Sequence, residues 1–121
     1  MKVLRSFQYA LKGIRHGLKG INMQVHVGAM VLVLILGVVL KISGSEWAIL
    51  LLCIGLVLMA ELFNTAIEEL CNGVHAINKE AYQYMGIPKD VAAGAVLVAA
   101  IFASLVGIFV FLPHIALVLH I

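Results

Sequence analysis

The sequence reads Glu-Leu-Phe-Asn-Thr-Ala-Ile-Glu-Glu-Leu-Cys-Asn from Glu61 to Asn72, directly after an apolar run that extends from Trp47 to Ala60. Because neither glycine nor proline stands where the two segments meet, both belong to one predicted helix. At about 100° per residue, one face of this helix carries polar side chains within about 80° of circumference: Glu61, Asn64, Glu68 and Asn72. The helix is thus apolar over its first half and carries a polar stripe along its second half.

The two carboxylates of this stripe stand where a membrane-spanning helix should end. A carboxylate at membrane depth costs several kcal/mol unless it faces protein, water or a cation, so an acid at that depth indicates a functional site. Leu62 and Phe63 flank Glu61 and favour this interpretation for it. Glu68 lies farther along the helix, where the alternative is a solvated helix end just beyond the lipid.

The composition excludes a soluble domain. The chain has 121 residues, of which 64% are hydrophobic and 12% charged, and its mean hydropathy is +1.13. A soluble protein this short exposes too much surface to cover it with so few polar groups, whereas lipid removes that demand. The sequence therefore predicts a single membrane domain over residues 1–121. We interpret Cys53 and Cys71 as packing residues, and we expect no signal peptide.

We expect an all-α membrane protein. Residues 1–20 predict an amphipathic interfacial helix, because apolar side chains repeat there at threes and fours beside basic ones. Transmembrane helices are expected at about 23–42, 47–68 and 89–112, with a short turn at 43–45. His26 stands at the edge of the first span and is interpreted as an interface residue rather than a ligand.

The connection from Gly73 to Ile87 is expected to be a solvated loop with one helical turn. Pro88 would then begin the last helix as its first residue, and Pro113 would follow its end. Seven of the eight basic residues lie in the N-terminal segment or at this connection, and only Lys41 lies on the other side. The positive-inside rule therefore predicts a cytoplasmic N-terminus and an external C-terminus, which accessibility labelling of tags at both ends tests.

The polar stripe and the start of the last helix carry a resemblance. The string Glu61-x-x-Asn64-Thr65-Ala66-Ile67-Glu68, followed at a distance by Lys89-Asp90, resembles the small integral-membrane diacylglycerol kinase and undecaprenol kinase family of bacteria. The resemblance covers nearly the whole chain and implies a homotrimer in the bacterial inner membrane, with active sites between subunits. It implies an ATP- and Mg²⁺-dependent kinase that phosphorylates the hydroxyl of a membrane lipid alcohol, undecaprenol or diacylglycerol. Residues 89–96 resemble the undecaprenol kinases somewhat more.

The residues themselves can supply the parts of phosphoryl transfer. This reaction needs a divalent metal ion, cations that offset phosphate charge, and a group that accepts the proton of the attacking hydroxyl. The carboxylate of Glu68 suits Mg²⁺, and Lys89 suits a phosphate. Glu61, one and a half turns deeper than Glu68, could meet a lipid hydroxyl.

The resemblance implies the same division of roles. Glu61 is the catalytic base and, with Asn64, contacts the lipid substrate, whereas Glu68 is the metal ligand. The nucleotide-binding residues that the resemblance implies come from three segments of the chain: Glu68, Lys89, Asp90, Tyr9 and Lys2.

Two departures from the family pattern bear on activity. The family has a second metal-binding glutamate just before the first span, where this chain has Gly20 and Ile21, and no acid precedes Glu46. The family's aspartate one turn after the second motif glutamate is Asn72 here. The residues that could take the place of the missing acids are Asn22, Gln24 and Glu69. A catalytically weak or inactive family member is therefore one alternative.

A second alternative belongs to a different class of protein. The polar stripe could line a path between helices in a small ion-conducting or scaffold subunit of the membrane. The Lys89-Asp90 pair favours the kinase, because a conduction path gains nothing from a cation at its rim. No Walker-type or protein-kinase glycine-rich loop is present, which excludes the soluble kinase architectures, and nothing supports nucleic-acid binding.

Overall fold

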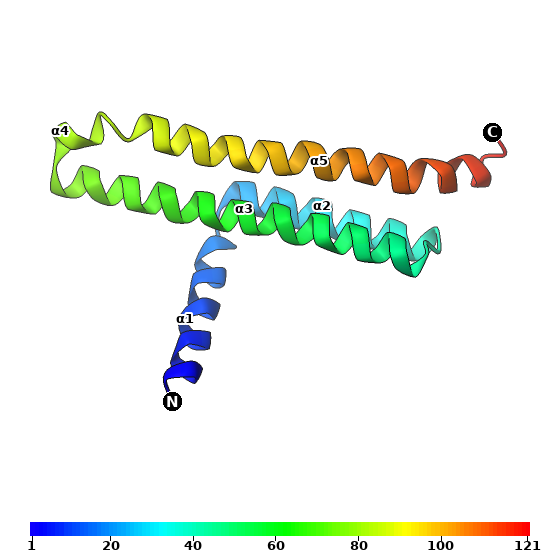
Figure 1. Cartoon of the computed structure of the whole chain (residues 1–121), viewed down its shortest axis with the longest axis horizontal. Helices are drawn as coiled ribbons and strands as arrows, with labels where there is room; N and C mark the ends of the chain where they lie inside the picture. Colours follow the sequence, from blue (N-terminus) through cyan, green and yellow to red (C-terminus); the bar gives the residue numbers. More distant parts are fainter.

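The computed structural model describes all 121 residues as an all-helical chain with three long helices packed side by side (Figure 1). The helices are α1 (Lys2–Gly17), α2 (Ile21–Val39), α3 (Gly44–Ile77), α4 (Lys79–Tyr82) and α5 (Gly86–Val118). Helix α3 is central, since α1, α2, α4 and α5 all contact it. Helix α1 leaves the bundle at a steep angle to the three long helices (Figure 1). This confirms the predicted all-α architecture.

Three helices are long and apolar enough to span a membrane: α2, α3 and α5. Only 12 of the 121 residues are buried within the chain, and large apolar side chains are exposed along all three helices. Exposed apolar surface on this scale needs lipid or other protein chains to cover it. The chain is therefore a membrane protein.

Helix α3 begins at a reversal of the chain that is fixed by hydrogen bonds. The Glu46 backbone N–H donates to Ser43 Oγ at 3.2 Å, and the Ser43 backbone N–H donates to Glu46 Oε2 at 2.8 Å. This reciprocal pair is a capping box, which satisfies donors that a helix start leaves unpaired. Lys41, just before this reversal, has a φ of 54°, which lies in the left-handed region. As a result α2 and α3 are antiparallel neighbours, as the predicted turn at 43–45 requires.

Gly37 lets α2 approach α3 closely at this reversal. A Cβ atom at position 37 would lie 2.6 and 2.7 Å from two atoms of the Trp47 ring and 3.2 Å from Ile42 Cδ1. We therefore expect Gly37→Ala to lower the free energy of unfolding by about 1–3 kcal/mol, because overpacking forces neighbours to move. Unfolding in detergent measures this loss. Gly28→Ala on the same helix is the matched control, since a Cβ there meets nothing within 4 Å; equal stabilities of the two variants would contradict the prediction.

The expectation that the last helix ends before Pro113 is wrong. Helix α5 continues through Pro113 to Val118. A proline removes one backbone hydrogen bond, but membrane helices tolerate it where neighbouring groups hold the segment. Here His114, directly after the proline, contacts Glu46 of α3. This contact between helices holds α5 together at a position where local propensity alone would end the helix.

The connection between the last two long helices is also more helical than predicted. Helix α3 continues to Ile77, and only the single turn α4 stands between it and α5. Asn78 ends α3 and caps α4, because its Oδ1 accepts hydrogen bonds from the backbone N–H groups of Glu80 and Ala81, both at 3.1 Å. Since α5 begins at Gly86, Pro88 is its third residue rather than its first. The predicted helical turn is present as α4 and most of the connection is exposed, but the part up to Ile77 belongs to α3.

Candidate functional site

The polar stripe of α3 runs from the interior of the bundle to its surface. Glu61 and Asn64 are buried, with exposed fractions of 4% and 3%. Glu68 is partly exposed, and Asn72 is exposed. The stripe therefore forms a continuous polar face that begins at a buried carboxylate and ends at solvent.

Asn64 connects the two acids of the stripe. Its Nδ2 donates to Glu68 Oε1 at 3.2 Å, as expected for side chains one helical turn apart. Its Oδ1 is buried and has no hydrogen-bond partner within the chain. A buried acceptor without a partner is costly, so this oxygen is available for a donor that the chain itself does not supply.

A cavity of about 290 Å³ lies over the buried part of the stripe. Its lining residues come from α2, α3 and α5: Asn22, Val25, His26, Glu61, Asn64, Ala93 and Val96. The structure thus brings Glu61 and Asn64 together at one cavity. Of the three possible substitutes for the missing glutamate, only Asn22 lines it. Gln24 instead donates to the backbone of Lys19, and Glu69 is exposed and contacts His16.

His26 belongs to this site, although the sequence pattern predicts it to be an interface residue rather than a ligand. Its Nε2 lies 3.8 Å from Glu61 Oε2, and the exposed fractions of the two side chains are 20% and 5%. The hairpin itself carries a signal that could have found this pair. His26 lies seventeen residues before Ser43, and Glu61 lies seventeen residues after Gly44. Because α2 and α3 are antiparallel and joined at this turn, equal distances from it place both side chains at the same height along the two helices.

Lys89 lies at the surface end of the stripe. Its Nζ donates to Asn72 Oδ1 and to the hydroxyl of Tyr82, both at 3.3 Å, and lies 5.6 Å from the centre of the Tyr82 ring. The Tyr82 ring also packs edge-on against His75, with ring centres 4.7 Å apart. No carboxylate lies within 4.0 Å of any lysine or arginine in the chain. The ammonium of Lys89 is therefore held by neutral groups, and its charge stays available for an anion. Sequence analysis did not identify Tyr82 and His75.

The remaining predicted nucleotide residues are exposed. Asp90 follows Lys89 directly and lies just after the first turn of α5, at the same end of the bundle. Lys2 and Tyr9 lie on α1, whose residues are exposed except for Gly17, and that helix projects away from the bundle (Figure 1). The only aromatic contact of Tyr9 is with Lys12, whose Nζ lies 5.8 Å from the ring centre. Within one chain, the structure does not bring Lys2 and Tyr9 to Lys89.

The donor set at Glu68 suits a metal ion that a nucleotide brings with it. No group of three or more His, Cys, Asp or Glu side chains converges within one chain. Mg²⁺ is commonly held by one or two carboxylates together with phosphates and waters. Glu68 offers one carboxylate, and Asn64 orients it through the hydrogen bond from Nδ2 to Oε1. These residues fit Mg²⁺ bound to phosphate.

A second, apolar cavity of about 430 Å³ lies between α2, α3 and α5. Fifteen of its 18 lining residues are hydrophobic, and Ala103 and Gly107 leave room on the α5 side. His26 lines this cavity as well as the polar one. The buried carboxylate of Glu61 therefore lies next to a junction between a polar and an apolar space.

Comparisons with known proteins give a consistent result. A family model described as prokaryotic diacylglycerol kinase matches residues 8–111. The chain is 37% identical to an undecaprenol kinase of Bacillus subtilis over 113 residues, which cover 93% of this chain and 89% of that protein. It is 35% identical to a diacylglycerol kinase of Synechocystis over 112 residues, which cover 92% of this chain and 63% of that protein. No solved structure matches the chain significantly.

Proposed function

Because the chain belongs to the prokaryotic diacylglycerol kinase family, we propose that it transfers the terminal phosphoryl group of ATP to the hydroxyl of a membrane lipid alcohol, with Mg²⁺ as metal ion. The observation that carries the proposal is the position of Glu61. Its buried carboxylate lines a polar cavity, and this cavity meets an apolar one at His26. A long-chain alcohol has these two parts, a hydroxyl and a hydrocarbon chain.

Each step of the transfer has a candidate residue. Glu61 accepts the proton as the lipid O–H bond breaks, and the lipid oxygen forms a bond to the γ-phosphorus of ATP. The bond between that phosphorus and the bridging oxygen breaks, and ADP leaves. Lys89, with Asp90 beside it, binds the nucleotide phosphates at the end of the stripe. Glu68 would hold Mg²⁺, which supplies charge neutralisation on the phosphates when bound.

Asn64 has a distinct role in this proposal. Its Nδ2 orients Glu68, and its unpartnered Oδ1 can accept a hydrogen bond from a substrate group in the cavity. The lipid hydroxyl carries one proton, which it can donate to this oxygen on binding and which passes to Glu61 as the reaction begins. We therefore place the lipid headgroup between Asn64 and Glu61.

We also propose a homotrimer in the bacterial inner membrane, with the N-terminus and the stripe end of α3 in the cytoplasm. The small buried core and the exposed apolar faces of the three long helices support association with further copies. Lys2 and Tyr9 are exposed on α1 and free to contact the nucleotide of a neighbouring copy. A site between subunits would explain why Lys2 and Tyr9 do not lie near Lys89 of the same chain.

The purified protein tests the proposal directly. With ATP and Mg²⁺, we expect phosphorylation of undecaprenol, of diacylglycerol or of both. The apolar cavity is lined by no Asp, Glu, Lys or Arg side chain that would favour one hydrocarbon chain over the other. Thin-layer separation of radiolabelled lipid products measures the transfer. A faster reaction with undecaprenol would agree with the higher identity to the undecaprenol kinase. Phosphorylation of neither lipid would contradict the proposal and favour an inactive family member.

A further inference from the structure

His26 stands apart from the other histidines because it contacts a buried acid. The other two His–Glu contacts, His16 with Glu69 and His114 with Glu46, involve carboxylates that are exposed or partly exposed. In the His26 contact the Glu61 side chain is only 5% exposed, and no other basic group lies within 4.0 Å of its carboxylate. A buried carboxylate is costly without a polar partner, and the His26 imidazole is the one basic side chain at ion-pair distance from it.

The contact also leaves part of the carboxylate free. His26 Nε2 approaches Oε2 of Glu61 at ion-pair distance, and no side chain of the protein donates a hydrogen bond to either carboxylate oxygen. Both residues line the polar cavity, where α5 contributes only Ala93 and Val96 and α2 adds the neutral Asn22. Glu68 is the next titratable group on α3 and is joined to this region through Asn64. Glu61 can therefore be held on one side by His26 while it faces a substrate hydroxyl on the other.

We propose that His26 is a positioning residue for the kinase reaction, which holds the Glu61 carboxylate toward the lipid hydroxyl at the junction of the two cavities. The inference rests on the proposed function, in which Glu61 is the base. His26 acts through Glu61, because a carboxylate with one oxygen fixed loses rotational freedom before the substrate arrives. The affinity for substrate should depend little on this contact, so we expect its loss to lower kcat rather than to raise KM.

Substitutions at position 26 test this role by separating kcat from KM. We expect His26→Leu to lower kcat by about 10- to 100-fold, the range found when the residue that orients a reacting group is removed, with KM for ATP unchanged. His26→Gln should recover part of the loss, because its amide group is polar and long enough to approach Glu61 Oε2.

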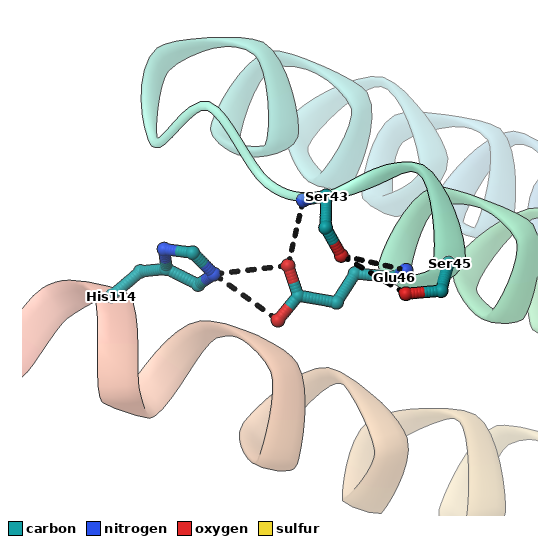
Figure 2. A network of polar contacts seen from close by, with 4 residues as sticks. All are labelled: Ser43, Ser45, Glu46 and His114. Atoms are coloured by element: carbon teal, nitrogen blue, oxygen red, sulfur yellow. Dashed lines mark hydrogen bonds and ion pairs between the residues drawn. The ribbon is translucent and has the colours of Figure 1, made fainter.

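A second His–Glu pair serves as the matched control. His114 Nε2 lies 3.1 Å from Glu46 Oε2 (Figure 2), where Glu46 stands in the first turn of α3 and His114 in the last part of α5. His114→Gln should leave kcat within about twofold of the parent. A His26→Leu variant with the kcat of the parent, or one whose whole effect lies in KM for ATP, would overturn the inference.

A stability measurement separates failure of this inference from failure of the proposed function. If the parent phosphorylates no lipid, the double-mutant cycle of His26→Leu and Glu61→Gln can still be measured by unfolding in detergent. A midpoint shift of the double variant smaller than the sum of the single shifts would support the contact. Additive shifts would overturn it, whatever the substrate of the enzyme.

Discussion

Glu61→Gln is expected to abolish lipid phosphorylation while leaving the affinity for Mg²⁺-ATP nearly unchanged. Glutamine keeps the shape of the side chain but cannot accept the proton of the attacking hydroxyl, and loss of a general base costs about 10²- to 10⁴-fold in rate. Glu61 is buried and lines the polar cavity, whereas Lys89 lies at the other end of the stripe, beside Asn72. The rate of lipid phosphorylation and the binding of a nucleotide analogue, measured on the same preparation, check both parts of this expectation.

The control for this variant is a conservative change of an acid outside the site. Glu80 is exposed in the first turn of α4, near the same end of the bundle. Glu80→Gln should keep the parent's rate and nucleotide affinity. Full lipid phosphorylation by Glu61→Gln would show that the polar stripe is not the active site.

Glu68→Gln is expected to weaken nucleotide binding instead. The carboxylate is partly exposed and oriented by Asn64, in the position that suits a metal ion bound to phosphate. Loss of a charged ligand should raise the dissociation constant for Mg²⁺-ATP by about 10- to 100-fold. Excess Mg²⁺ should restore part of the activity, since mass action refills a weakened site. Titration of the nucleotide analogue at several Mg²⁺ concentrations measures both effects.

Rescue should stay incomplete because Glu68 has few partners. The chain has Gly20 and Ile21 where the resemblance implies a second metal-binding glutamate, and no group of three metal ligands converges within one chain. As the proposed metal ligand, Glu68 would therefore carry more of the metal ion's charge than a paired carboxylate would. If Glu61→Gln and Glu68→Gln both keep the parent's nucleotide affinity, the proposed division of roles between the two acids is wrong.

The sequence alone determined the class of protein and the composition of the polar stripe. Long apolar runs and a period of about 100° per residue are local properties, so the three candidate membrane helices and the polar face of α3 could be predicted without knowledge of packing. The family could be predicted as well, because its motif is contained in eight consecutive residues, and the comparisons confirm it. The roles of Glu61, Glu68, Lys89 and Asp90 stay predictions.

Only the tertiary structure decided which side chains meet. His26 and Glu61 come from different helices, and so do Lys89 and Asn72, so their contacts depend on the level at which antiparallel helices pack. The same holds for Pro113, where a proline that would end an isolated helix lies inside α5 beside the contact of His114 with Glu46. Such contacts join residues far apart in the chain, and no local pattern records them. The sequence therefore specified the helices and their polar faces, while packing between helices turned one polar face into a buried site.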